Sequence, residues 1–115
     1  MLQPSLIDVF PDELRDEDRR ALFARWMDSN PDAVGEMVAW AYELDERRGT
    51  VAVQYLFEKE RYEGTARLVP VPFTTEGGER REYGINHNDR ALFGRWLKEH
   101  HPALRVTTRK SRWDA

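Results

Sequence analysis

The sequence predicts a single α+β domain, with three N-terminal helices followed by a β-hairpin, a fourth helix and a short C-terminal strand. Three observations lead to this prediction. Amphipathic patterns of helical spacing fill residues 16–63, an alternating apolar pattern starts near residue 66, and a Gly-Gly pair then separates two extended segments. A chain of 115 residues with 11% aromatic side chains is also suited to one small core.

The chain is expected to begin with an irregular arm, residues 1–14, because Pro4 and Pro11 interrupt it. The first helix is expected from Asp16 to Asp28, since acidic residues favour the positive end of a helix dipole. Its predicted apolar stripe consists of Leu22, Phe23, Trp26 and Met27. Three arginines are expected outside that stripe, namely Arg19, Arg20 and Arg25.

The second helix is expected from Pro31 to about Arg47. Asn30 is its predicted N-cap, because Asn followed by Pro is a common helix start. Gly49 is its predicted C-terminal cap in the left-handed conformation.

The third helix is expected from its N-cap, Thr50, to Glu63, and Gly64 is expected to end it. The segment "TVAVQYLF" also favours a strand, because it is rich in β-branched and aromatic residues. The helix is preferred because apolar residues recur four positions apart, as in Val51 and Tyr55, and charged residues follow.

The second half of the chain is expected to contain the hairpin and the last helix. Pro70 and Pro72 restrict "TARLVPVPF" to an edge strand, "TTEGGER" is the predicted turn, and "RREYGI" is the partner strand. The segment "NHND" is expected to cap a helix from Asp89 to about His100. The segment "ALRVTTR" is expected to form a final short strand.

Two stretches of the chain are nearly identical, "DRRALFARW" from residue 18 and "DRALFGRW" from residue 89. In each, Leu, Phe and Trp fall on one helical face. A duplicated unit is one explanation, but the flanking sequences do not match. We therefore predict two helices that touch and bury these side chains in one shared core: Leu22, Phe23, Trp26, Leu92, Phe93 and Trp96.

Composition narrows the classes of function. The chain contains no Cys, so disulfides and thiolate chemistry are excluded. The first ten residues lack the basic and apolar regions of a signal peptide, and no apolar stretch approaches the roughly 20 residues of a membrane span. We expect a cytoplasmic protein with no membrane partner.

Candidate catalytic chemistry is sparse. His100 and His101 are adjacent and would point about 100° apart on a helix, so they cannot easily hold one metal ion. His87 lies in "NHND", where capping explains the polar residues better. The Gly-Gly segment lacks the Gly-Lys-Ser/Thr sequence of a phosphate loop. We expect no enzyme activity, no metal site and no cofactor.

Charge is distributed unevenly along the chain. Residues 1–79 contain 9 basic and 17 acidic residues, a net charge of −8, whereas residues 80–115 contain 9 and 4, a net charge of +5. A basic segment can bind phosphate, and an acidic body can face a basic protein. The two poles could also simply solvate the domain.

The helix order, followed by a hairpin, matches a winged helix-turn-helix, in which residues 50–63 would enter a nucleic-acid groove. The acidic residues of that helix oppose this interpretation, because such helices are normally basic. Base or phosphate contacts are predicted for two groups: Gln54, Arg61, Arg80 and Arg81 on the helix and wing, and Arg105, Arg109, Lys110 and Arg112 in the basic tail of residues 105–115.

The segment "YGINHNDRALFGRWLKEHHPAL", with "TTRKSRW" after it and "VQYLFEKERYEG" before it, resembles small uncharacterised proteins encoded by phages and prophages. The resemblance covers roughly residues 50–112, and His87 departs from the Asn of those proteins. It implies a mobile-element origin and a winged-helix-like domain. It implies no activity.

Two hypotheses follow from the sequence. The first is a non-catalytic nucleic-acid-binding module that uses the eight residues named above. The alternative is a protein-interaction or nucleic-acid-mimicking factor that presents its acidic N-terminal body to a protein partner.

Overall fold

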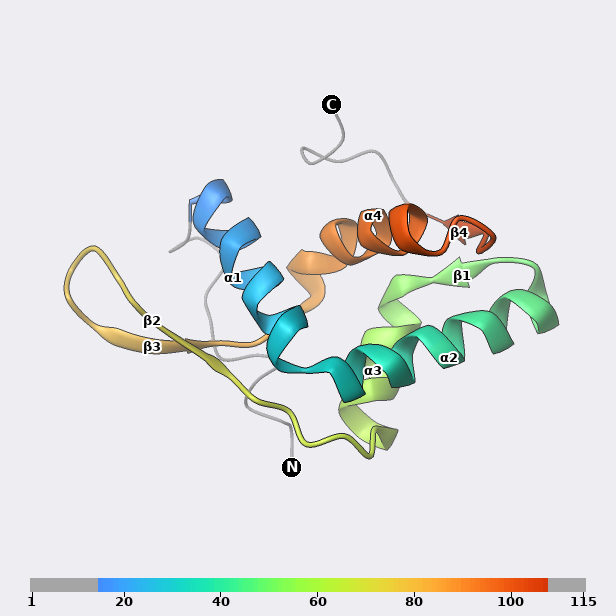
Figure 1. Ribbon diagram of the computed structural model, residues 1–115, viewed down its shortest axis with the longest axis horizontal. Helices are drawn as coiled ribbons and strands as arrows, with labels where there is room; N and C mark the ends of the chain where they lie inside the picture. The colour runs from blue at the N-terminus through green and yellow to red at the C-terminus, as the bar shows by residue number, and fades with distance from the viewer. Residues whose placement is uncertain (1–14, 108–115) are drawn as a thin grey trace.

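The computed structural model describes residues 15–107 and confirms the α+β architecture (Figure 1). In this range the helices are α1 (Asp16–Ser29), α2 (Pro31–Arg48), α3 (Val53–Glu63) and α4 (Arg90–His100), and a 3-10 turn, η3 (His87–Asp89), leads into α4. The strands are β1 (Val51–Ala52), β2 (Val71–Thr74), β3 (Arg80–Tyr83) and β4 (Val106–Thr107). The predicted N-terminal arm and most of the predicted basic tail lie outside the described residues.

The strands form two separate pairs. β2 and β3 make the predicted antiparallel hairpin, with Phe73 opposite Arg81, and Gly78 adopts a positive φ of 84° in the turn. β1 pairs in parallel with β4, with Val51 opposite Val106. The final strand is thus confirmed. Because β1 joins β4 and not the hairpin, the described strands do not form one sheet across the domain.

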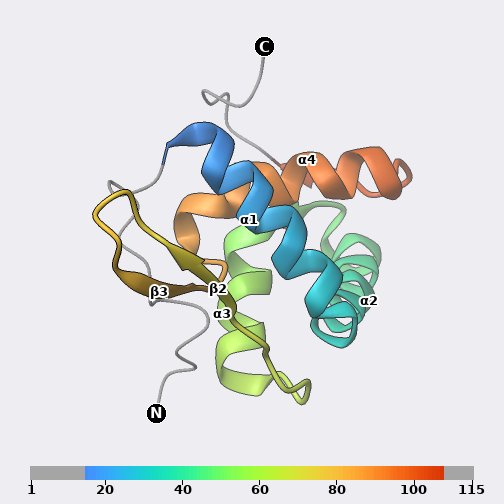
Figure 2. The ribbon, with the colours of Figure 1, turned by 60° about the vertical axis from the view of Figure 1, so that its left-hand side comes forward.

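The two strand pairs lie at opposite ends of the molecule in Figure 1, with the hairpin at one end and β1 with β4 at the other. The helices fill the space between them. In Figure 2, α1 lies over α3 and α4, and the hairpin projects beside α1. One apolar core connects these helices and includes residues from both strand pairs, such as Val51 and Val71.

The two similar stretches of sequence do contribute to one core. Leu22, Phe23 and Trp26 of α1 and Leu92 and Phe93 of α4 are buried as predicted. Trp96 is less buried than the other five residues and lies at the edge of the core. It stacks on Phe93 at a ring-centroid distance of 5.7 Å and on His100 at 4.7 Å, so its ring lies between the core and the surface.

The predicted Thr50 cap of α3 is wrong, and Asn30 is confirmed as the N-cap residue of α2 by its position, although its side chain has another role. α3 begins after Ala52, because Val51 and Ala52 are extended and pair with β4, and the Thr50 hydroxyl hydrogen-bonds to that of Thr107. The Asn30 side chain does not cap α2. It donates to the carbonyls of Trp26 and Val69, each at 2.9 Å, and accepts the Val69 N–H at 2.6 Å. Asn30 therefore ties the α1–α2 junction to the segment before the hairpin.

The remaining helix ends agree with the sequence. Gly49 has a φ of 76° and ends α2 in the left-handed region, and Gly64 follows the last residue of α3. Asn86 begins η3 with a capping box, in which its side chain accepts the Asn88 N–H at 3.0 Å and the Asp89 carboxylate accepts the Asn86 N–H at 3.1 Å.

Candidate functional site

Helix α3 presents two adjacent stripes of side chains to the surface. One stripe is polar and contains Gln54, Glu58 and Arg61, which are spaced four and three residues apart and so lie on one face. The other stripe contains the exposed Tyr55 and Tyr62 on either side of Lys59. The N-terminal half of the polar stripe faces the turn that leads into α4.

A small hollow of about 160 Å³ separates the polar stripe from the segment that precedes α4. Phe57 and Ile85 contribute its apolar part, and Ile85 is fully buried. The polar lining comes from both sides of the hollow: Gln54, Glu58, Arg61, Asn86 and His87. The structure therefore brings together Gln54 and Arg61, two of the residues nominated from the sequence.

Arg90 connects the two walls of this hollow. Its Nε donates to the His87 carbonyl at 2.8 Å, and its Nη1 donates to the side-chain oxygen of Gln54. The Gln54 amide in turn donates to Glu58 at 3.3 Å. The capping box holds the turn that carries His87, so the position of the Gln54 amide is set by contacts from both walls.

Arg61 has an unsatisfied hydrogen-bond donor at this site. Its Nε is buried and has no hydrogen-bond partner among the described residues. Its guanidinium lies 6.0 Å from the centroid of the Tyr62 ring, a weak cation–π contact. A buried donor without a partner is costly, and a ligand at the surface does not reach this atom in the conformation that the structure shows.

The other nominated residues do not gather at the hollow. Arg80 and Arg81 lie in β3, where Arg81 is paired with Glu79 at 2.8 Å. Arg105 precedes β4 and makes hydrogen bonds from Nε and Nη2 to the carboxylate of Asp45, at 3.0 and 3.2 Å. β3 and β4 lie at opposite ends of the molecule in Figure 1, so these arginines do not form one cluster. Arg109, Lys110 and Arg112 lie outside the described residues.

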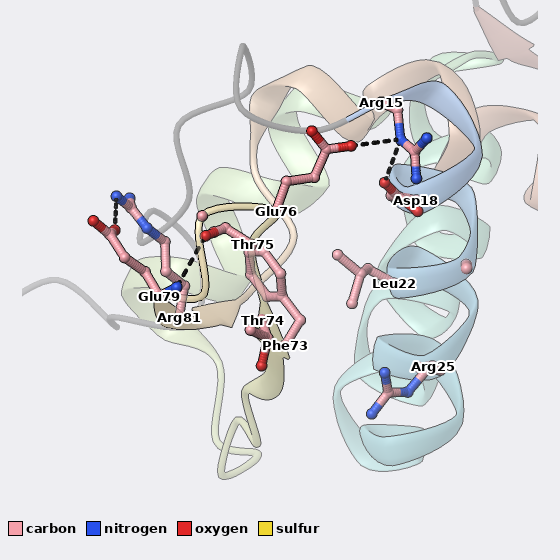
Figure 3. Close-up of a pocket in the computed structure, with 12 residues that line it drawn as sticks. Arg15, Asp18, Leu22, Arg25, Phe73, Thr74, Thr75, Glu76, Glu79 and Arg81 are labelled. Carbon is pink, nitrogen blue, oxygen red and sulfur yellow. Dashed lines mark hydrogen bonds and ion pairs between the residues drawn. The ribbon is translucent and has the colours of Figure 1, made fainter.

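A larger groove of about 850 Å³ lies between α1 and the hairpin (Figure 3). Leu22 and Phe73 supply apolar surface to it. Three arginines and three acidic residues also line the groove, and the structure pairs several of them: Arg15 is 3.1 Å from Asp18 and 3.8 Å from Glu76. Because the charges balance, the groove shows no preference for an anionic or a cationic ligand.

A buried ion pair joins α1 to the start of α4. Arg19 and Asp89 are both fully buried, with Nη1 of Arg19 3.3 Å from the Asp89 carboxylate, which also accepts the Tyr83 hydroxyl at 2.7 Å. Burial raises the pKa of Asp89, and its contacts with Tyr83, Asn86 and Arg19 oppose that increase. The prediction that Arg19 lies outside the buried face of α1 is therefore wrong.

A second buried acid lies between α2 and α3. Glu60 is 2% exposed, and neither of its carboxyl oxygens has a hydrogen-bond partner among the described residues. Burial, together with the neighbouring Glu36 carboxylate, raises the pKa of Glu60 to about 8. Partial burial would also raise the pKa of Glu36, but hydrogen bonds from Thr65 and Ala66 lower it to about 2.

No protein-family model, curated protein or solved structure matches this chain. Residues 15–107 contain no group of three or more His, Asp or Glu side chains placed to hold a metal ion. No helix in the same range is long and apolar enough to cross a membrane. Inferences about function therefore depend on the side chains of the surface itself.

Sequence reasoning missed His87, which lines the hollow, and Arg90, which hydrogen-bonds to Gln54 and to the His87 carbonyl. Both lie in or next to "NHND", which was interpreted as a cap, and that interpretation is confirmed for Asn86. The cap also fixes where His87 and Arg90 lie. The signal in the sequence was that a capping segment holds its own polar side chains in fixed positions. Sequence spacing does not show that α3 is the helix opposite these side chains.

Proposed function

We propose that this protein is a small non-catalytic nucleic-acid-binding module that contacts its ligand through the hollow beside α3. The observation that supports this most is the arrangement of Gln54, Arg61, His87 and Arg90 around one site. Arg can donate two hydrogen bonds to guanine O6 and N7, and Gln can accept from adenine N6 and donate to adenine N7.

The proposal includes a winged-helix-like mode of binding. In that mode α3 is the helix that enters a groove, the break at Gly49 is the turn before it, and the hairpin is the wing. Arg80 is exposed on that hairpin and is the candidate phosphate contact there. The charge of α3 is less unfavourable than its sequence indicates, because Glu60 is buried and stays protonated up to about pH 8.

Fluorescence anisotropy with labelled duplex DNA, over a series of salt concentrations, tests this proposal. Four to six phosphate contacts predict a slope of about −4 to −5 for log affinity against log salt. Arg61→Ala and Arg90→Ala should each weaken binding by about tenfold. Arg25→Ala, which removes the same charge from the exposed face of α1, is the matched control and should have a smaller effect. Absence of binding at low salt would overturn the proposal.

The basic segment after β4 makes a separate contribution. Replacing Arg109, Lys110 and Arg112 together by Ala should reduce affinity equally for all sequences and flatten the salt slope by about two to three units. Any preference for sequence should persist in that variant and be lost in Gln54→Ala. The reverse pattern, in which the triple variant changes preference, would contradict the assignment of base contacts to α3.

A protein-binding role is the second candidate, and the aromatic stripe of α3 favours it. Tyr62 is 70% exposed, Tyr55 is 45% exposed, and the Lys59 ammonium lies 5.0 Å from the centroid of the Trp40 ring. Aromatic residues that remain exposed on a helix are typical of protein interfaces. Tyr62→Ala should leave DNA affinity unchanged if the stripe serves a protein partner. A loss of DNA affinity would assign the stripe to the nucleic-acid surface.

A further inference from the structure

The hairpin has two edges with different backbone groups. Phe73 lies opposite Arg81, and the Thr75 N–H donates to the Glu79 carbonyl at 2.8 Å, so these residues point their backbone groups into the hairpin. Alternate residues of an antiparallel strand face opposite sides. The residues between them therefore point their N–H and C=O groups outward, away from the partner strand.

The outward groups of β2 are poorly suited to pairing. Its outer edge consists of Pro70, Pro72 and Thr74, and the two prolines have no N–H to donate. β2 also packs against α1. The outer edge of β3 differs, because Arg80 and Glu82 are both exposed and both have an N–H and a C=O on the side that pairs with no other described strand. Figure 2 shows β3 on the side of the hairpin that is turned away from α1.

We propose that β3 is a self-association edge, at which two copies of this chain pair antiparallel about a two-fold axis at Arg81. In this arrangement Arg80 of each copy lies opposite Glu82 of the other, and the two residues exchange backbone hydrogen bonds. The symmetry makes both ion pairs equivalent. The result is a four-stranded sheet in which the two β3 strands are central.

Charge selects this register over its neighbours. Only every second residue of β3 points its backbone groups outward, so the pairing can shift only by two residues. The nearest shifts place Arg80 opposite Arg80 or Glu82 opposite Glu82 of the other copy. Like charges directly opposite each other destabilise a strand pair, whereas opposite charges stabilise it. Arg81 faces its symmetry copy in the proposed register, but Glu79 of its own chain already neutralises it at 2.8 Å.

The prolines of β2 limit the assembly to two copies. Once the β3 edges are paired, the outer edges of the four-stranded sheet are those with Pro70 and Pro72, which cannot continue the ladder. The paired edge is also short, since β3 spans only Arg80–Tyr83. It buries much less than the roughly 1,200 Å² of a stable interface, so the dimer should form only at high protein concentration.

Sedimentation velocity of the full chain without nucleic acid, from about 10 µM to about 1 mM, tests the proposal at the affinities expected of a weak dimer. The wild-type protein should shift from monomer to dimer with concentration. Arg80→Glu and Glu82→Arg should each weaken dimerisation by about tenfold or more, because each replaces two ion pairs by repulsions. An equimolar mixture of the two variants should dimerise again, as should the double variant with both changes.

Two exposed positions outside the hairpin provide matched controls. Arg67→Glu and Glu46→Arg make the same charge changes and should dimerise as the wild type does. Hydrogen exchange gives a second readout, since the amides of Arg80 and Glu82 should become more protected with concentration. A wild type that stays monomeric at about 1 mM, or a mixture no more dimeric than its components, would overturn the proposal. Because nucleic acid is absent, its failure would leave the proposed function intact.

Discussion

The two buried polar clusters of this domain are stabilised in different ways. Arg19 and Asp89 are both charged groups, and each compensates the other at 3.3 Å. Among the described residues, no cation is paired with Glu60. Its nearest charged neighbour is the Glu36 carboxylate, and its pKa rises to about 8, so it is neutral at pH 7. The Asp89 cluster is stabilised by an opposite charge, and the Glu60 cluster is stabilised by protonation of the acid.

This difference shows how the environment of a buried acid determines its chemistry. The Asp89 carboxylate accepts hydrogen bonds from Tyr83 and from the Asn86 backbone in addition to Arg19, which offset part of the cost of its burial. Glu60 has no such donors, and binding a proton removes the charge that burial disfavours. The first cluster should therefore respond mainly to mutation, and the second mainly to pH.

The largest expected effect comes from breaking the ion pair. Asp89→Ala removes the buried carboxylate from Arg19 and from the Tyr83 hydroxyl, and it should reduce the free energy of unfolding by about 4 kcal/mol. Urea unfolding followed by tryptophan fluorescence at pH 7 measures this. Asp18→Ala, which removes an exposed carboxylate next to Arg15, should leave the midpoint almost unchanged. If Asp89→Ala and Asp18→Ala reduce the free energy of unfolding equally, burial does not make the Arg19–Asp89 pair more important for stability than the exposed Arg15–Asp18 pair.

The second largest effect concerns pH. The pKa of Glu60 is near 4.5 in the unfolded chain and about 8 in the fold, so its stabilising contribution is complete below pH 4.5 and is lost as pH rises through 8. The contribution of Glu36 to stability depends on pH in the opposite direction, because its pKa is lowered to about 2. Its contribution is present above pH 4.5 and is lost as pH falls toward 2. Glu36 and Glu60 together should therefore stabilise the fold most near pH 4.5.

Glu60→Gln tests the pH argument, because Gln imitates the protonated acid but cannot ionise. The wild type should lose up to about 1.4 kcal/mol of stability per pH unit between pH 5 and 8, and the variant should lack this slope. At pH 8 the variant should be more stable than the wild type by about 4 kcal/mol. Glu58→Gln, at an exposed position of the same helix, is the control. If stability still falls with pH in Glu60→Gln as it does in the wild type, a group other than Glu60 causes the pH dependence.

The smallest expected effect involves the space around Glu60. A Cβ at Gly64 would lie 2.1 Å from Oε2 of Glu60 and 2.5 Å from its backbone oxygen. Gly64→Ala should therefore reduce the free energy of unfolding by about 1–2 kcal/mol through overpacking. Gly77→Ala is the matched control, since its Cβ would meet only the Thr75 hydroxyl oxygen, at 3.8 Å. A neutral Gly64→Ala would indicate that the Glu60 side chain can move away at little cost.

The sequence predicted most of the fold because its helices and hairpin are specified locally. Helical spacing, Gly49 and the Gly77-Gly78 turn act within a few residues of one another, and these elements are confirmed. The pairing of β1 with β4 was missed, because two-residue strands leave no periodic pattern. The burial of Arg19 was missed for a related reason, since its partner Asp89 lies far away in sequence.

The candidate site was predictable only in part. Gln54 and Arg61 were found because polar residues on one helical face can be read from spacing. The partners that complete the hollow, His87 and Arg90, depend on how the turn before α4 docks against α3, which is a property of the tertiary structure. The partly exposed Trp96 illustrates the same limit, because an identical motif in α1 buries its Trp completely.

The pairing of β1 with β4 also has a consequence for how the protein folds during synthesis. Val51 donates its N–H to the Arg105 carbonyl at 2.9 Å, so the strand that leads into α3 is completed by almost the last described residues of the chain. Closing such a long loop is slow compared with forming helices or a hairpin. The ribosome must therefore release the chain at least through Val106 before the start of α3 acquires its partner, and a nascent chain that stalls earlier would leave the apolar Val51 uncovered.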